Sequence, residues 1–397
     1  MKPRKDVLEL FADARQRKSY VKISAPMVRY SKLEFRTLLR HNGVELCFTP
    51  MIIADSFCRS DLARQNEFTT NGDDTPLIVQ FAAKDSVQLL TAAEMVHPYA
   101  DGVDLNCGCP QRWAISSGYG CATLKTPELL HDMIRTLKRN LPGKFTASVK
   151  MRLLRKDDTG STVELCRRIE QCGASFITIH GRTPWEKTCE PVDLDAVASI
   201  KRALNVPVVA NGNIRTLEDA DRAFELTQCE GIMAARGLLA NPSLYTGTAV
   251  TPVSCVEDWV SLARRAGHQM TFQCFHHHLT FMTEKLIRRK QRVVLNNITR
   301  SDDVLDFLRK ELSVALSDSD EPRIPFSDYL QCKYDDTLYE TKKVNGLDDQ
   351  SPSPVYTQQG HGKIYAEYTA RSCEERQPPL QLCSMGDKSL FDERTEM

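Results

Sequence analysis

Short apolar runs alternate with longer amphipathic stretches between residues 20 and 240. An apolar run of four to eight residues is typical of a buried strand, whereas an apolar residue at every third or fourth position is typical of a helix packed on one face. The second spacing occurs between the apolar runs, for example over residues 126–139, 161–171 and 216–226. The apolar runs themselves predict eight strands, over residues 21–25, 45–48, 76–81, 102–105, 145–151, 175–179, 206–210 and 230–234.

Eight strands that alternate with helices favour an α/β fold in which a parallel sheet closes into a (β/α)₈ TIM barrel. The alternative is an open, doubly wound parallel sheet. That alternative is weaker because no Gly-x-Gly-x-x-Gly sequence follows the first strand.

Residues 251–313 show helical spacing without strand patterns. Apolar residues fall at i, i+3, i+4 and i+7 in one group, and at similar spacing in a second: Trp259, Leu262, Ala263 and Ala266, then Phe275, Leu279, Met282 and Leu286. The sequence Ser301-Asp302-Asp303 is typical of the start of a third helix. We therefore expect an N-terminal lead-in over residues 1–19, a barrel over 20–250 and a small all-α domain over 251–313.

From Val314 onward the sequence is rich in Asp, Ser, Pro and Gln and has little periodicity, so we expect residues 314–397 to form a disordered acidic tail. Those residues hold 9 Lys and Arg against 16 Asp and Glu, whereas the first 313 residues hold 43 against 36. The body is therefore basic, which favours a polyanionic partner.

The composition is ordinary for a globular protein, with 41% hydrophobic and 26% charged residues. No apolar run approaches the roughly 20 residues of a membrane span, so no membrane partner is expected. The N-terminus lacks the apolar core of a secretory signal. We expect a cytoplasmic protein, with the nucleus as a second compartment, whose 14 cysteines are mostly buried free thiols.

Polar residues and glycines gather where the predicted strands end. The most informative cluster is Asn106-Cys107-Gly108-Cys109-Pro110-Gln111, which follows the buried run 102–105. A TIM barrel carries its reactive groups at this end of its strands, whatever its chemistry. The Cys-x-Cys pair also raises the possibility of zinc, but no second Cys-x₂-Cys or His-x₃₋₅-His pair completes a tetrahedral site, so no metal is expected.

Five motifs lie at or near the predicted strand ends, in this order: Ala25-Pro26-Met27, Asn106-Cys107-Gly108-Cys109-Pro110, Val149-Lys150-Met151-Arg152, His180-Gly181-Arg182-Thr183 and Asn211-Gly212-Asn213-Ile214. These motifs and their order resemble those of the tRNA-dihydrouridine synthase family, whose members use FMN to reduce a specific uridine of tRNA. The resemblance covers about residues 20–310. The variant over residues 106–113 is most similar to the eukaryotic dihydrouridine synthase 4-like branch, which is associated with positions 20a and 20b of the D-loop.

The resemblance implies that NADPH or NADH reduces FMN, that the flavin N5 delivers a hydride to C6 of uracil, and that Cys109 donates a proton to C5. A cysteine with an unperturbed pKa of about 8.5 is mostly a protonated thiol at neutral pH, so it suits the role of an acid. The same resemblance assigns FMN contacts to the other strand ends: Pro26, Met27, Val28, Gln80, Lys150, His180, Asn211, Gly212, Asn213, Ala235 and Arg236.

Contacts with tRNA are expected from two groups of residues. Asn106, Arg152, Arg182 and Lys187 lie near the predicted mouth, and a basic stripe at i, i+3, i+4 and i+7 on the second small helix comprises Lys285, Arg288, Arg289 and Arg292. We expect a monomer. Two other functions stay open: an FMN barrel that reduces a free small molecule, and a tRNA-binding factor without catalytic turnover.

Overall fold

A computed structural model describes residues 6–316 and 322–332 and shows one parallel sheet that closes on itself. The second strand of the ring pairs with both the first and the third, and the first also pairs with the last. The prediction of a TIM barrel is confirmed, and the open doubly wound sheet is wrong. The ring consists of β1 (Val21–Ser24), β2 (Leu46–Phe48), β5 (Leu77–Ala82), β6 (Gly102–Cys107), β7 (Thr146–Arg152), β8 (Phe176–His180), β9 (Val208–Asn211) and β10 (Gly231–Ala234).

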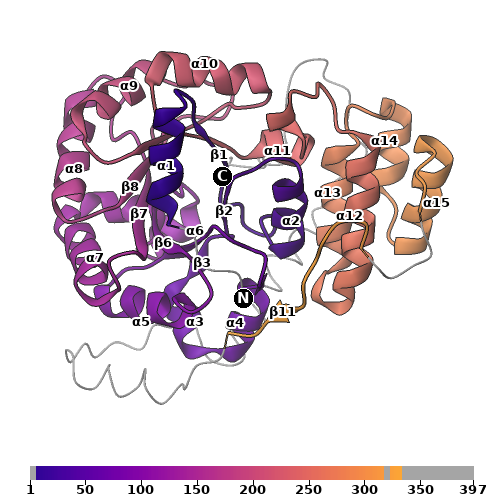
Figure 1. The fold of residues 1–397 in the computed structure, drawn as a ribbon, viewed down its shortest axis with the longest axis horizontal. Coiled ribbons are helices and arrows are strands. Elements are labelled where there is room, and N and C mark those ends of the chain that lie inside the picture. The colour runs from indigo at the N-terminus through magenta and orange to yellow at the C-terminus, as the bar shows by residue number, and fades with distance from the viewer. Residues whose placement is uncertain (1–5, 317–321, 333–397) are drawn as a thin grey trace. The chain divides into compact units, whose positions relative to one another are not determined.

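Helices surround this ring (Figure 1). The predicted stretches 126–139, 161–171 and 216–226 are confirmed as α7 (Pro127–Asn140), α8 (Thr159–Gln171) and α10 (Leu217–Thr227). The remaining elements of the barrel domain are α2 (Leu33–His41), β3 (Ile52–Ile53), α3 (Ala54–Arg59), α4 (Asp61–Glu67), β4 (Thr70–Asn71), α5 (Ser86–Val96), α6 (Arg112–Ser116), η1 (Gly120–Lys125), α9 (Leu194–Ala203), α11 (Arg236–Ala240) and η2 (Leu244–Thr246).

The interior of the barrel is apolar at the N-terminal ends of the strands. Ile23, Phe176 and Met233 belong to one buried cluster there, and helix α1 (Val7–Gln16) adds Phe11 to it. The rings of Phe11 and Phe176 lie 5.2 Å apart. The predicted lead-in therefore contains a helix that covers this end of the barrel, which leaves the opposite end for polar groups.

The helical part that follows the barrel consists of α12 (Val253–Ala266), η3 (Gly267–Gln269), α13 (Phe272–Met282), α14 (Arg289–Asn296) and α15 (Ser301–Leu312). The predicted helix start at Ser301 is confirmed. Trp259 is fully buried, donates from Nε1 to the carbonyl oxygen of Phe275, and stacks on His278 with ring centroids 4.4 Å apart. Burial lowers the pKa of His278 to about 3, so His278 is a neutral core residue.

The predicted second small helix is shorter than its apolar spacing suggests. Helix α13 ends at Met282, and Leu286 lies in the turn that follows. The hydroxyl and the N–H of Thr283 both donate to the carbonyl oxygen of Leu279, and the carbonyl of Thr283 then accepts from Leu286 and Ile287. The chain therefore turns at Thr283 before α14 begins.

Part of the predicted disordered tail is ordered. Residues 322–332 include β11 (Tyr329–Leu330), which pairs antiparallel with β4, and Arg323 forms salt bridges with Glu257 and Asp258 of α12. Ile324 is buried. A two-residue strand has no detectable periodicity, which is why the pattern missed it. The expectation of disorder over 317–321 and 333–397 lies outside the described residues.

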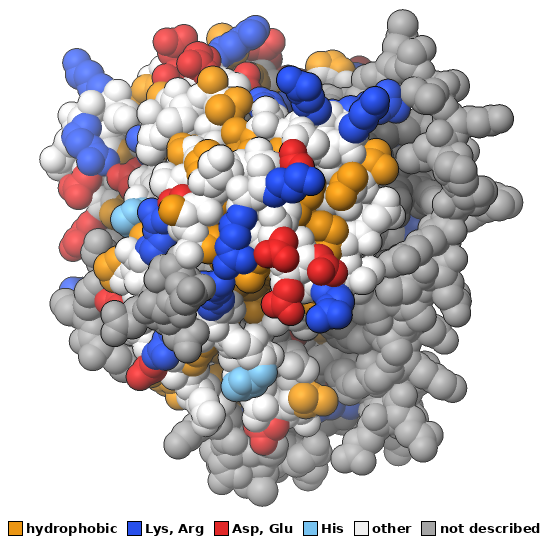
Figure 2. Space-filling view, turned by 90° about the vertical axis from the view of Figure 1, so that its right-hand side faces the viewer, with side chains coloured by type: hydrophobic (Ala, Val, Ile, Leu, Met, Phe, Trp, Pro, Cys, Tyr) orange, Lys and Arg blue, Asp and Glu red, His pale blue; other side chains and the backbone are white. Residues whose placement is uncertain are grey.

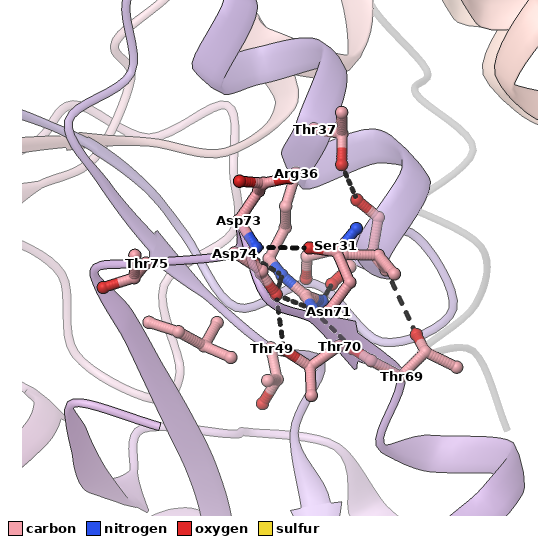
Figure 3. A network of polar contacts seen from close by, with 12 residues as sticks. Ser31, Arg36, Thr37, Thr49, Thr69, Thr70, Asn71, Asp73, Asp74 and Thr75 are labelled. Atoms are coloured by element: carbon pink, nitrogen blue, oxygen red, sulfur yellow. Dashed lines mark hydrogen bonds and ion pairs between the residues drawn. The ribbon is translucent and has the colours of Figure 1, made fainter. Parts of the chain in front are cut away.

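A buried network ties α2 to the loop after β4 (Figure 3). Asp74 accepts from Arg36 at 2.5 Å and from Arg40 at 3.1 Å, and Arg36 also donates to the carbonyl oxygens of Ser31 and Thr69. Burial alone would raise the pKa of Asp74, but the two guanidinium groups outweigh it and hold that pKa below its usual range. The carboxylate is therefore ionised and paired on both sides.

Replacing this carboxylate should destabilise the fold. The change Asp74→Asn keeps the shape but leaves the buried guanidinium group of Arg36 and the half-buried one of Arg40 without their counter-charge, so we expect the free energy of unfolding to fall by about 3 kcal/mol. Chemical denaturation measures the loss. The matched control is Asp306→Asn, which removes an exposed partner of Arg309 and should change stability little. Equal effects of the two changes would contradict this account.

Candidate active site

Parallel pairing places the predicted site residues in rows at the C-terminal end of the barrel. Within one row Gln80, Asp104 and Ser148 are partners on β5, β6 and β7. In the next row toward the mouth, Asn106, Lys150 and Thr178 are partners on β6, β7 and β8. The last row brings Arg152, His180 and Asn211 together. Residues distant in the sequence therefore share one end of the barrel.

The loop that carries Cys109 is held by backbone contacts. Asn106 Oδ1 accepts hydrogen bonds from the N–H groups of Gly108 and Cys109, at 3.3 and 3.0 Å. Gly120 packs against this loop with a φ of +62°, and a Cβ at that position would lie 2.6 Å from the carbonyl oxygen of Cys109. Only glycine fits there without a shift of the loop.

The two cysteines of the motif differ in accessibility. Cys107 is fully buried on the helix-facing side of β6, whereas Cys109 is partly exposed. Burial raises the pKa of the Cys109 thiol, although the charges of Arg152 and Lys150 act in the opposite direction. Cys109 is therefore a protonated thiol at neutral pH, which is the form that a proton donor requires.

Arg152 joins two loops of the mouth. Its Nε donates to the carbonyl oxygen of Gly108 and one terminal nitrogen donates to that of Thr183, each at 3.0 Å. These bonds connect the loop after β6 with the loop after β8. The Arg152 guanidinium therefore supports the loop that bears Cys109, and its contact with RNA stays a prediction.

Arg182 and Lys187 have different environments. The side chain of Arg182 is only 1% exposed, and one of its terminal nitrogens lies 3.3 Å from Nε2 of His180. Its contact with RNA stays a prediction. Lys187 belongs to the segment Glu186–Pro191, which is part of a structural unit other than the one that contains the barrel. Its side chain is exposed, and its N–H donates to the carboxylate of Glu190.

The protonation state of His180 follows from its neighbours. Burial and the positive charges of Arg152, Lys150 and Arg182 lower its pKa well below the ordinary value, so the ring is neutral. Because a guanidinium can only donate, the contact between Arg182 and Nε2 makes that ring nitrogen the acceptor. The proton of the neutral ring is therefore on Nδ1.

Lys150 presents an ammonium group at the mouth. Burial and the charge of Arg152 lower its pKa to about 8, which leaves it mostly charged at neutral pH. Its Nζ forms no hydrogen bond or salt bridge within the described part of the chain. Its ladder partner Thr178 has a buried hydroxyl that likewise lacks a hydrogen-bond partner there. These groups suit a bound, electron-rich ring.

The other residues expected to contact FMN also lie at strand ends. Asn211 donates to the carbonyl oxygen of Met233 at 2.8 Å. Gly212 has a φ of +133°, and a Cβ there would lie 3.1 Å from the His180 ring, so this turn needs glycine. The rest vary in exposure: Pro26, Ala235 and Arg236 are half-buried, Met27 is buried, and Val28 and Asn213 are exposed.

Sequence reasoning missed several residues of this region. Asp104, Ser148 and Thr178 each lie two positions before a predicted site residue, so they point to the same side of their strands. Polar residues two positions apart inside an otherwise apolar strand are the signal that could have identified them. Gly120 gave no comparable signal, because its role depends on a contact across the loop.

The predicted basic stripe does not exist as one helical face. Lys285 and Arg288 precede α14, whereas Arg289 is its first residue and Arg292 follows within the helix. The turn at Thr283 breaks the helical spacing. Arg292 is 3.4 Å from Glu284, whereas the other three side chains are exposed. On the side of the molecule that faces right in Figure 1, Lys and Arg side chains are interspersed with acidic and apolar ones (Figure 2).

Within residues 6–316 and 322–332, every helix is too short or too polar to cross a bilayer. Within the same ranges, no three His, Cys, Asp or Glu side chains group closely enough to hold a metal ion.

A closed parallel barrel with a thiol loop and convergent polar side chains at one end defines the chain as a TIM-barrel enzyme. Its sequence matches the dihydrouridine synthase (Dus) family over residues 23–306. The chain belongs to the dihydrouridine synthase family.

Relatives that match over most of their own length support this assignment. The chain is 48% identical to a mouse protein named tRNA-dihydrouridine(20a/20b) synthase [NAD(P)+]-like, over 77% of this chain and 92% of the relative. Its human counterpart is 46% identical, over 77% and 94%. A Schizosaccharomyces pombe protein named tRNA-dihydrouridine(20a/20b) synthase [NAD(P)+] is 40% identical, over 79% and 94%.

The environment of His180 gives a spectroscopic prediction. Because its pKa is strongly lowered, we expect its ring to stay neutral from pH 7.5 down to pH 5.5, with the proton on Nδ1. Nitrogen NMR of histidine-labelled protein measures this, with His180→Gln identifying the resonance. An imidazolium signal at pH 7, or a proton on Nε2, would refute the assignment.

Proposed function

We propose that this protein reduces the C5–C6 double bond of a uridine in the D-loop of tRNA, at position 20a or 20b, with FMN and with NADPH or NADH as electron donor. Family membership and the names of the relatives support the reaction and the substrate. The observation that carries the chemical step is the partly exposed, protonated thiol of Cys109 at the barrel mouth.

The residues present fit a flavin. FMN, when bound, supplies the hydride that adds to C6 of the uracil. The Lys150 ammonium lacks a partner among the described residues and would stabilise negative charge on the pyrimidine side of the ring. The unpaired hydroxyl of Thr178 lies beside it in the ladder. Asn211, Gly212 and Arg236, after β9 and β10, lie where TIM barrels commonly hold a phosphate.

The protein's own groups complete the reaction on uracil. Cys109 would donate its thiol proton to C5, while neutral His180 offers Nδ1–H as a hydrogen-bond donor. Arg152 holds the carbonyls of Gly108 and Thr183 and so keeps the thiol loop in place. Its positive charge also limits how far burial raises the pKa of Cys109, so the thiolate formed after proton transfer is less costly.

The exposed basic residues before and within the first turn of α14 support tRNA binding. Arg288, Arg289 and Lys290 surround the N-terminus of this helix, where no acidic residue is present in the first turn. Positive charge at a helix N-terminus opposes the helix dipole and costs roughly 0.3–1 kcal/mol per charge. A bound phosphate would remove that conflict, since helix N-termini attract anions.

The function is tested by incubating flavin-loaded protein with NADPH and unmodified tRNA and mapping dihydrouridine by mass spectrometry. We expect Cys109→Ala to reduce product formation by about 10²- to 10⁴-fold, the usual worth of a general acid, while FMN stays bound. Cys189→Ala, which removes an exposed thiol, is the control and should keep the wild-type rate.

Each adverse outcome of this experiment has a distinct meaning. Full activity of Cys109→Ala would eliminate the assignment of Cys109 as acid. Absence of product from the wild-type protein would contradict the proposed reaction. Reduction of free uridine as fast as tRNA would favour the small-molecule barrel instead.

A second prediction concerns tRNA binding. Replacing Lys285, Arg288 and Arg289 with Gln should weaken binding and flatten its dependence on salt, by about one unit of slope for each phosphate that the protein no longer neutralises. Binding isotherms at several salt concentrations measure the slope. The matched control is Arg168→Gln on α8, which also removes one exposed positive charge and should be compared with Arg289→Gln alone. An unchanged slope in the triple variant would exclude these residues as phosphate ligands.

A further inference from the structure

A chain of buried hydrogen bonds runs from the middle of β6 to the loop that carries Cys109. Gln80 Nε2 donates to Asp104 Oδ2 at 2.8 Å, and Asn106 Nδ2 donates to Gln80 Oε1 at 2.8 Å. The N–H of Cys109 then donates to Asn106 Oδ1 at 3.0 Å. Asp104, Gln80 and Asn106 are 0%, 1% and 7% exposed, so water competes little for these bonds.

The chain has one consistent direction. The backbone N–H groups of Gly108 and Cys109 can only donate, so Asn106 turns its oxygen toward them. Its nitrogen then faces Gln80, which presents an oxygen, and the nitrogen of Gln80 faces Asp104. An ionised carboxylate can only accept, so Asp104 enforces at one end the same amide orientations that the backbone requires at the other.

Asp104 is well supported as the acceptor at this end. Ser148 donates from Oγ to the second carboxylate oxygen at 2.6 Å. Burial raises the pKa of Asp104 to about 6, against the opposing effects of the hydrogen bonds from Ser148 and Gln80 and of the charge of Lys150. The group is therefore mostly ionised at neutral pH.

A carboxylate at this depth is costly to the fold. Its row borders the apolar cluster that contains Ile78 and Phe176, and a buried charge lowers stability unless its partners compensate. A neutral apolar side chain would pack there without that cost. The feature that an apolar residue could not supply is an acceptor aimed at Gln80.

We propose that Asp104 is a positioning residue that acts through Gln80 and Asn106 to hold the Cys109 loop and to fix the direction of both amides at the barrel mouth. The role in catalysis rests on the proposed function. With these orientations, Asn106 keeps a second N–H for a carbonyl oxygen of the bound uracil or flavin. The hydrogen-bond partners of the Asp104 carboxylate are Gln80 and Ser148, so its link to Cys109 is indirect.

Three variants distinguish the role of Asp104 as a hydrogen-bond acceptor from the effects of its charge and of its packing. Asp104→Asn can still present an oxygen to Gln80 while its nitrogen donates to Ser148 Oγ, so the chain survives. Asp104→Leu removes the acceptor, and Gln80→Met removes the link without touching the carboxylate. The readouts are hydrogen exchange of the Gly108 and Cys109 amides, and the single-turnover rate of dihydrouridine formation at saturating FMN.

We expect Asp104→Leu and Gln80→Met to speed exchange of both amides at least tenfold and to slow uridine reduction by about 10- to 100-fold, as misplaced catalytic groups do. Asp104→Asn should stay within about threefold of the wild type on both measures, because it keeps the acceptor. If Asp104→Leu fails to fold, Gln80→Met carries the same expectation. Wild-type exchange and rate in Gln80→Met would overturn the proposal.

A second result would also overturn the proposal. If Asp104→Asn and Asp104→Leu changed amide exchange and the reduction rate equally, the charge of Asp104 would matter, and its role as a hydrogen-bond acceptor would not. The two hypotheses remain distinguishable. If wild-type protein forms no dihydrouridine, the proposed function fails, whereas amide exchange still decides whether Asp104 holds the loop.

Discussion

Closure of the parallel sheet is the constraint on which the site depends. Since β2 pairs with both β1 and β5, and β1 with β10, all eight strands must point the same way around the ring. Their C-terminal ends therefore share one rim. Helix α1 covers the other end with Phe11, so polar side chains are tolerated only toward the open mouth. In an open sheet the strand ends would lie in a line, and Lys150 and His180 would be far from residues on the edge strands.

The second constraint is the excess of positive charge inside the mouth. Lys150, Arg152 and Arg182 surround His180, and the one described carboxylate that opposes them in this region's rows is Asp104. Two of the cations are stabilised by other means: Arg152 by backbone carbonyls, and Arg182 partly by the His180 ring. Lys150 alone has no such partner among the described residues, so the effects of burial and of the Arg152 charge on its pKa are not offset by a hydrogen bond, and the ammonium suits an anionic ligand.

The fold could be predicted from the sequence because periodicity reports burial directly. Strand residues such as those over 102–105 are apolar whichever strand they pair with, and the positions of α7, α8 and α10 follow from one apolar face each. Features that depend on tertiary contacts could not be predicted. The burial of Arg182 depends on the direction of its side chain, which spacing does not specify. The pairing of β11 with β4 depends on a partner that is distant in the sequence.

The arrangement of the basic residues near α14 also depends on a local contact that spacing does not specify. Spacing of i, i+3, i+4 and i+7 aligns side chains only while backbone hydrogen bonds continue, and Thr283 ends them. The charges that result are not a stripe along a helix but a cluster at the N-terminus of one. There the helix dipole and the guanidinium groups of Arg288 and Arg289 act in the same direction on an anion. A phosphate bound at such a point would fix the position of the RNA without reading a base, so under the proposed function the choice of uridine would depend on the groups at the barrel mouth.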